Sequence, residues 1–208
     1  MKRRALLKAG VAFAVPGVLS FGASAKPVSK AKAPKILVVY FSRPGMNYVS
    51  GDMVNLPVGN TEKFAKIIAK TLDAPLFRIE PVTPYPFDYR KTTAIAREER
   101  SAGKARDAKA IPDIRGYDVI FWGHPIWYGE MPYIVRGVLS KLDCAGKTIV
   151  PFVTHEGSGI GDTANLVRSF QMRAAVREGL GILGTRFARN EPVEPEITAW
   201  LKRLGYQK

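Results

Sequence analysis

The feature that most constrains the fold is an alternation of apolar runs and amphipathic segments after residue 34. Runs with the length and composition of buried β-strands occur at residues 35–41, 74–80, 118–123 and 147–153, and residues 179–187 contain a fifth strand that Gly181 and Gly184 weaken. Segments with apolar residues at helical spacing lie between and after them, at 61–72, 88–102, 132–142, 163–175 and 197–204. The alternation predicts an α/β fold, in which parallel strands are joined by right-handed crossovers and helices cover both faces of the sheet.

Residues 1–25 have the layout of a cleavable export signal, with a basic start, a mildly apolar run and an Ala-Ser-Ala end. The pair Arg3-Arg4 resembles a twin-arginine signal, which is an address read by a receptor. An uncleaved membrane anchor is the alternative, but glycine and proline interrupt a run shorter than the ~20 residues that a spanning helix needs. We therefore expect a periplasmic protein with a signal peptide (1–25), a polar linker (26–34), one domain (35–208) and no stable membrane span after cleavage.

The chain is strongly basic, with a formal net charge of +14 over 208 residues. Part of this charge belongs to the expected signal, but the remainder is still basic and spread along the sequence. Such a surface attracts anionic partners. Because no nucleic-acid recognition motif accompanies the charge, we expect a solvated surface that steers anionic partners, and no nucleic acid.

Cysteine and histidine are scarce, which limits the chemistry open to the chain. The single cysteine, Cys144, excludes an intramolecular disulfide, and its place in a predicted turn favours a structural role. The only histidines, His124 and His155, both follow predicted strands. They are candidates for a proton-donating pair or for binding an acceptor, with a structural or exposed position as the alternative. Two histidines without a third ligand predict no metal site.

The loops after the first, third and fourth strands are where a ligand is expected, because open parallel sheets bind ligands beyond the carboxyl ends of their strands. In the first loop, Ser42 ends a strand and Gly59-Asn60-Thr61 begins a helix. A helix N-terminus presents unpaired N–H groups that bind phosphate, although the same residues form ordinary helix caps.

The second loop places two adjacent aromatic residues, Trp127 and Tyr128, directly after a strand. They cover a flat apolar ligand or, alternatively, pack on the neighbouring helix. In the third loop, residues 154–161 contain three glycines, which let the backbone approach a ligand closely. A flexible connector is the simpler alternative there.

Together these loops resemble one family, the flavodoxin-like proteins that carry an insertion in the first loop. The motifs are Tyr40-Phe41-Ser42-Arg43, Gly59-Asn60-Thr61, Pro125-Ile126-Trp127-Tyr128-Gly129 and residues 154–159. The resemblance implies a three-layer sandwich with a five-stranded parallel sheet in the order 2-1-3-4-5. It also implies FMN as the cofactor.

The resemblance further implies which residues contact FMN. Ser42, Asn60 and Thr61 would hold its phosphate, Trp127 or Tyr128 would stack on the isoalloxazine, and the Tyr128–Gly129 peptide would meet the central-ring nitrogen. The chain departs from the family pattern at Val58, where a hydroxyl is expected, and Arg43 either replaces that donor or points to solvent. The full set of expected cofactor-binding residues is Ser42, Arg43, Gly59, Asn60, Thr61, Pro125, Ile126, Trp127, Tyr128, Gly129, Thr154, His155, Glu156, Gly157, Ser158 and Gly159.

Two redox functions follow from the resemblance: an electron carrier of the cell envelope, or an FMN-dependent NAD(P)H reductase of a quinone or another small acceptor. The chain has no G-x-G-x-x-G fingerprint after a strand, which favours the carrier. The partner that these functions imply is a redox protein or a small-molecule acceptor, including anionic ones. A binding module without redox chemistry is a third interpretation.

The insertion consists of the sixteen residues between Ser42 and Gly59. Loops of this length inside a compact domain are usually functional. Its apolar residues predict that it lies against the flavin edge or the substrate side of the pocket; they are Met46, Tyr48, Met53 and Leu56. The alternative is a surface excursion packed on its own side chains.

Overall fold

The computed structural model describes residues 33–206. The predicted signal peptide and most of the predicted linker lie outside these residues. The strands are β1 (Ile36–Tyr40), β2 (Gly45–Val49), β3 (Asp52–Leu56), β4 (Leu76–Arg78), β5 (Val119–Pro125), β6 (Thr148–His155), β7 (Ala175–Val176) and β8 (Leu180–Leu183). The helices are α1 (Asn60–Leu72), α2 (Tyr89–Ala102), α3 (Tyr133–Leu139), α4 (Thr163–Phe170), α5 (Gly184–Ala188) and α6 (Glu194–Arg203). None of the described helices is long and apolar enough to cross a bilayer.

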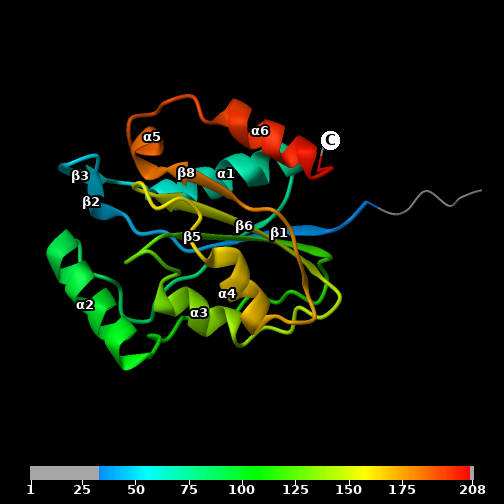
Figure 1. The fold of residues 1–208 in the computed structure, drawn as a ribbon, viewed down its shortest axis with the longest axis horizontal. Coiled ribbons are helices and arrows are strands. Elements are labelled where there is room, and N and C mark those ends of the chain that lie inside the picture. Colours follow the sequence, from blue (N-terminus) through cyan, green and yellow to red (C-terminus); the bar gives the residue numbers. More distant parts are fainter. Residues whose placement is uncertain (1–32, 207–208) are drawn as a thin grey trace, which may run out of the picture. The chain divides into compact units, whose positions relative to one another are not determined.

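The main sheet is parallel, with neighbours in the order β4-β1-β5-β6 and both β7 and β8 beside β6. In chain order this is the predicted 2-1-3-4-5 arrangement, because β7 and β8 share the fifth position. Helices α1, α5 and α6 lie on one face of the sheet, and α2, α3 and α4 lie on the other (Figure 1). The predicted three-layer α/β sandwich is therefore confirmed.

Each face of the sheet has its own apolar core. On one side Phe64 of α1 and Trp200 of α6 pack with strand residues such as Phe121. On the other side Ile134 and neighbouring residues of α3 pack with inward-facing residues of the same strands. Such two-sided burial explains why the strands read as continuous apolar runs rather than as alternating ones.

The cysteine belongs to the second of these cores. Cys144 is buried, and its N–H donates to Gln171 Oε1 at 3.1 Å. Burial raises the pKa of the Cys144 thiol to about 11. A thiol with this pKa is not ionised near neutral pH, so the predicted structural role is confirmed.

The fifth strand lies within the predicted range 179–187 but is short. β8 ends at Leu183, residues Gly184–Ala188 form α5, and a further short strand, β7, precedes the range. A break between β7 and β8 lies opposite Pro151 of β6, which has no N–H to donate to a ladder. Here the chain passes so close that a Cβ on Gly179 would lie 2.7 Å from the Pro151 carbonyl oxygen.

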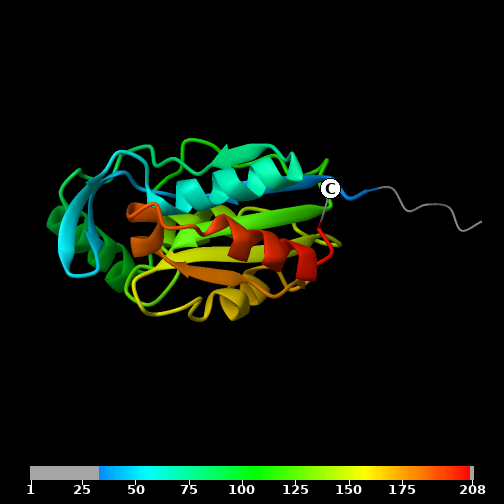
Figure 2. The same ribbon diagram turned by 90° about the horizontal axis from the view of Figure 1, so that it is seen from above.

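The insertion, expected as a loop, contains a β-hairpin. Strands β2 and β3 pair antiparallel from Gly45↔Leu56 to Val49↔Asp52. The connecting residues Ser50 and Gly51 have φ angles of 50° and 104°, as two-residue hairpin turns require. The hairpin stands beyond the carboxyl ends of the strands, where β2 contacts α2 and α5 (Figure 2).

Candidate functional site

The three predicted loops converge at the carboxyl end of the sheet around a cavity of about 150 Å³. Ten of the sixteen residues predicted to bind the cofactor line it: Ser42, Arg43, Asn60, Thr61, Pro125, Ile126, Trp127, Thr154, His155 and Glu156. We call this space the loop cavity. Segments more than 110 positions apart in the sequence therefore share one site.

The two halves of the first loop meet although the hairpin separates them. Ser42 Oγ accepts a hydrogen bond from the Glu62 N–H at 3.1 Å, which caps the first turn of α1. This approach requires Gly59, because a Cβ there would lie 2.3 Å from Ser42 Oγ and 2.7 Å from the Arg43 carbonyl oxygen. Gly59 has a φ of −66°, which any residue adopts, so the requirement is for space and not for conformation.

The start of α1 presents polar groups to the loop cavity. The first N–H groups of a helix have no intrahelical partner, and the positive end of the helix dipole lies with them. Asn60 Oδ1 is buried without a hydrogen-bond partner in the described residues. A buried acceptor of this kind costs free energy unless a donor reaches it. The arrangement therefore suits a ligand that brings both an anionic group and hydroxyl donors.

A buried hydroxyl pair joins the first and third loops. Thr61 Oγ1 and Thr154 Oγ1 lie 2.6 Å apart, and both residues are almost fully buried. The second loop is attached to the same strand end, since the Ile126 N–H donates to the Thr154 carbonyl at 2.8 Å. These two hydrogen bonds fix the positions of the three loops relative to one another.

Arg43 points into the protein, not into solvent as one of the two alternatives had it. Its Nη1 donates to the carbonyls of Pro86 and Phe87 at 2.9 and 3.2 Å, and its Nη2 donates to the carbonyl of Met46. The guanidinium thus connects the base of the hairpin to the segment before α2. Burial lowers the pKa of Arg43 from its usual value.

The aromatic loop is a tight turn. Trp127 and Glu130 exchange backbone hydrogen bonds of 2.9 and 3.0 Å, and the central residues Tyr128 and Gly129 have φ angles of 50° and 78°. Trp127 packs edge-on against Phe41, with ring centroids 5.5 Å apart. One part of the indole still borders the loop cavity, so packing and ligand contact are compatible at this residue.

Tyr128 lies on the other side of this turn, against α2. Its hydroxyl donates to the Thr93 carbonyl at 2.9 Å, and the side chain remains 40% exposed. It lines a second cavity of about 350 Å³, which shares Arg43, Asn47, Tyr89, Ile126 and Trp127 with the loop cavity. The two cavities thus adjoin, with Trp127 bordering both.

The third loop contributes its first residues to the cavity. His155 Nδ1 accepts from the Gly157 N–H at 3.0 Å, and burial lowers the pKa of His155. Glu156 Oε2 accepts from Thr185 Oγ1 at 2.5 Å, at the start of α5. The remaining predicted residues, Gly157, Ser158 and Gly159, do not line the loop cavity.

The two histidines occupy different environments. His124 is fully buried in β5, where Nδ1 lies 3.0 Å from the Pro125 carbonyl and Nε2 has no partner in the described residues. Burial lowers the pKa of His124 to about 4. Because His155 lines the loop cavity and His124 does not, only His155 is placed to meet a ligand there. Among the described residues, no cluster of three or more His, Cys, Asp or Glu could hold a metal ion.

Three residues of the loop cavity were not among those predicted: Asn47, Tyr89 and Gly184. Tyr48, one of the insertion residues expected at the pocket, does line the cavity. Asn47 precedes it in the hairpin, and Gly184, which lies in the range predicted to contain the fifth strand, starts α5. A Cβ on Gly184 would lie 2.7 Å from Glu156 Oε1 and 2.8 Å from Asn60 Nδ2, so this glycine permits three segments to meet.

The chain was compared with families and with solved structures. The model of a family described as flavodoxin matches residues 35–204. A proposed flavoprotein from Bacteroides eggerthii shares 27% identity, with 83% of this chain and 98% of that chain covered and a TM-score of 0.64. A proposed flavoprotein from Bacteroides uniformis shares 23% identity, with coverages of 82% and 99% and a TM-score of 0.63.

A flavoprotein from Lactobacillus acidophilus, solved in complex with FMN, shares 20% identity. The match spans 72% of this chain and 93% of that chain, with a TM-score of 0.52. At these lower identities the similarity concerns the fold. No curated protein matches the chain.

Proposed function

The chain belongs to the flavodoxin family, and we propose from this premise that it binds FMN in the loop cavity and transfers electrons through it. The observation that carries the proposal is the junction of Ser42, Asn60 and Thr61 at the start of α1. The Trp127 turn, which follows the neighbouring strand β5, borders the same cavity. One end of the site offers donors for a phosphate, and the other offers an aromatic wall for a flat ring system.

The residues present fit such a cofactor. The N-terminus of α1, with the Ser42 and Thr61 hydroxyls beside it, would hold the phosphate. Asn60 Oδ1 would accept a hydrogen bond from a hydroxyl of the ribityl chain. This buried oxygen would then have the hydrogen-bond partner that it lacks among the described residues. Trp127 would supply apolar surface to the ring system. FMN, when bound, supplies reversible one- and two-electron chemistry.

The protein's own part is to bind, to orient and to exclude water. Arg43 and Glu156 give the cavity lining one positive and one negative group. His155, whose pKa is lowered, is neutral near pH 7 and offers a ring nitrogen but no charge at the cavity edge. We assign it as the candidate residue for proton exchange with a bound ligand, and we assign no such role to buried His124.

We further propose that the protein works in the cell envelope as an electron carrier. The support is the sequence of residues 1–25, with its Arg3-Arg4 pair and its Ala-Ser-Ala end. The basic composition suits an anionic redox partner. Replacing both arginines with lysine is expected to keep the protein out of the periplasm, as measured by fractionation. Unchanged export would remove the twin-arginine assignment.

A reductase of a small acceptor is the second candidate. The observation in its favour is the cavity of about 350 Å³ beside Trp127 and Tyr128, which offers room for an acceptor next to the cofactor site. A carrier should accept electrons one at a time and ignore NAD(P)H. A reductase should oxidise NAD(P)H in the presence of a quinone.

The deciding experiment is titration of the purified protein with FMN, followed by absorption and by quenching of flavin fluorescence. We expect stoichiometric binding, with affinity reduced at least about tenfold in Asn60→Ala, because a buried polar contact is lost. Asn165→Ala, at an exposed position of α4 outside the loop cavity, is the control and should bind as the parent does. A protein that stays colourless with FMN in excess would overturn the proposal.

A further inference from the structure

A third cavity, of about 610 Å³, lies beside the loop cavity on the side of β4. Its walls are largely aromatic and aliphatic, with Phe41, Ile79, Tyr85 and Phe87 among them, and several prolines complete the lining. A volume of this size lies in the range of small-molecule sites. We call this space the β4 cavity.

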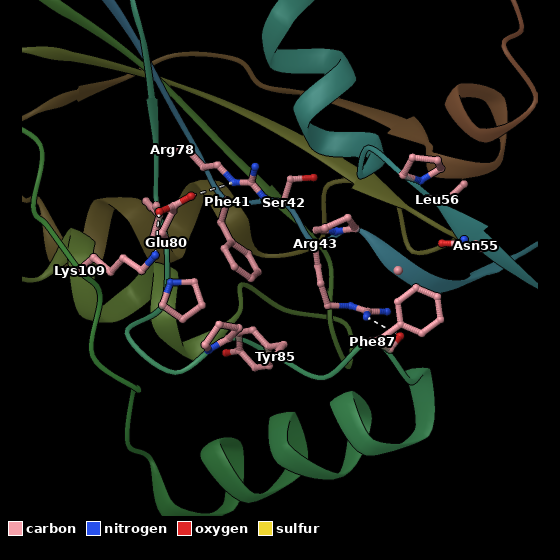
Figure 3. A pocket seen from close by; sticks show the side chains of 16 residues that line it. Phe41, Ser42, Arg43, Asn55, Leu56, Arg78, Glu80, Tyr85, Phe87 and Lys109 are labelled. Carbon is pink, nitrogen blue, oxygen red and sulfur yellow. Dashed lines mark hydrogen bonds and ion pairs between the residues drawn. The ribbon is translucent and has the colours of Figure 1, made fainter.

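One wall of the β4 cavity consists of the insertion. Pro44, Gly45, Asn55, Leu56 and Pro57 all belong to the residues between Ser42 and Gly59. The opposite wall is the segment from β4 to α2, and Figure 3 shows Phe41 pointing into the space between the two walls.

Arg43 holds these walls together. Its guanidinium donates to Phe87 in one wall and to Met46 in the other, and the Met46 N–H donates to the Phe87 carbonyl at 3.0 Å. The cavity is therefore preorganised and not a gap that side chains would readily close. Preorganisation of this kind reduces the entropy cost of binding a ligand.

The polar end of the β4 cavity carries an excess of positive charge. Arg78 and Lys109 both pair with Glu80, at 3.9 and 3.2 Å, and the three side chains gather at the end away from the hairpin (Figure 3). Arg78 also reaches Glu62 at 3.3 Å, but Glu62 is already paired with Lys66 at 2.6 Å. With Arg43 counted, the lining has three cations and one carboxylate.

We propose that the β4 cavity is a second ligand site, which takes a small aromatic acid. The ring would lie between the hairpin base and the segment 78–87, against Phe41, Tyr85 and Phe87. The carboxylate would lie beside Lys109 and Arg78. Complementary charge sets the preference for an acid, because the apolar walls alone accept neutral rings equally well.

The β4 cavity is separate from the cofactor site but shares a wall with it. Ser42 and Arg43 line both cavities. Tyr85 of the β4 cavity packs edge-on against Trp127 of the loop cavity, with ring centroids 4.9 Å apart. A ligand here would thus be one layer of side chains from the proposed flavin, without competing for its place. The inference does not depend on the identity of the cofactor.

The test is calorimetric titration of the FMN-loaded protein with 2-naphthoate and with its neutral analogue 2-naphthamide. We expect 2-naphthoate to bind without releasing FMN and to bind more weakly as salt is raised. Lys109→Gln should weaken 2-naphthoate binding about threefold to fivefold, the range for one exposed ion pair, and leave 2-naphthamide unchanged. Lys104→Gln, exposed on the same connection but outside the cavity, should change neither.

A second pair of variants tests the apolar wall. Phe87→Ala should weaken both compounds, whereas Val82→Ala, exposed on the same segment and outside the lining, should weaken neither. The proposal fails if millimolar 2-naphthoate gives no binding heat, if it displaces FMN, or if Lys109→Gln binds it as the parent does. If the purified protein takes up no FMN yet binds 2-naphthoate with the same Lys109 dependence, the proposed function falls and the second site stands.

Discussion

The Ser42 hydroxyl accepts a hydrogen bond from the backbone N–H of Glu62 at 3.1 Å, although the two residues are twenty positions apart. The hairpin between them leaves the helix cap intact, because its two ends, Gly45 and Leu56, are paired and lie side by side. Helix α1 is thus capped by the residue that follows strand β1, with the hairpin residues looped out between them.

Ser42→Ala should lower both stability and FMN affinity. A lost cap bond costs about 1 kcal/mol of unfolding free energy, and the hydroxyl also leaves the proposed phosphate site. Urea unfolding and FMN titration measure the two effects. Ser101→Ala, exposed near the end of α2, is the control and should alter neither. An unchanged unfolding free energy in Ser42→Ala would show that the bond is not a cap.

Gly59→Ala should destabilise the protein by about 1–3 kcal/mol, the range for overpacking a tight site. The added methyl would lie 2.3 Å from Ser42 Oγ, so either the cap or the hairpin base must move. Gly116→Ala adds the same methyl in open space and should be neutral or slightly stabilising. Urea unfolding compares the two variants, and equal effects would contradict the steric argument.

The Thr61–Thr154 hydroxyl pair should behave non-additively. Replacing either residue with valine leaves the other hydroxyl buried and unpaired, which costs about 1–3 kcal/mol, whereas the double variant should be less destabilised than the sum of the singles. A double-mutant cycle by urea unfolding measures the coupling. Strict additivity would mean that the two hydroxyls have other partners.

Arg43→Lys should loosen the hairpin without unfolding the domain. Lysine lacks the planar guanidinium that reaches the carbonyls of Pro86, Phe87 and Met46 together. We therefore expect the free energy of unfolding to fall by about 1–3 kcal/mol. Limited proteolysis should cut residues 45–56 faster in this variant. Arg90→Lys, exposed on α2, should be cut as slowly as the parent. Equal cutting rates for Arg43→Lys would show that the hairpin is held by other contacts.

His124 should make the protein less stable in mild acid. Its pKa is about 4 in the folded protein and about 6.5 when unfolded, so only the unfolded state gains a proton as pH falls below 6.5. His124 therefore lowers the free energy of unfolding by about 2 kcal/mol between pH 7 and pH 5. His124→Leu should lack this part of the pH dependence, and His155→Gln should keep it. Unfolding curves at the two pH values test the difference, and an unchanged pH dependence in His124→Leu would contradict the assignment.

The sheet could be predicted from the sequence because each strand and helix is marked by a pattern of residues that are neighbours in the chain. Runs such as residues 35–41 are apolar on both faces, and helix-period segments follow each run, so the layers could be inferred before any contact was known. The strand order followed from the family resemblance. The loop motifs likewise predicted most of the loop cavity, since strand ends in a parallel sheet must meet at one edge.

Where the prediction was incomplete, the deciding contact was distant in sequence. β7 and β8 are separated where Gly179 passes beside Pro151 of β6, and Gly184 starts a helix where Asn60 and Glu156 lie close to it. Asn47, which was not predicted to line the cavity, reaches it because the hairpin folds over the strand ends.

The sequence by itself determined the fold class, the family and the three loops of the candidate site, because these rest on periodicity and on short motifs. Only the tertiary structure decided the fold and the position of the insertion. Arg43 is a basic residue beside a phosphate motif in the sequence, but its donors are satisfied by carbonyls of Pro86, Phe87 and Met46. A buried guanidinium binds whichever acceptors surround it, and those acceptors come from segments that only the folded chain brings together.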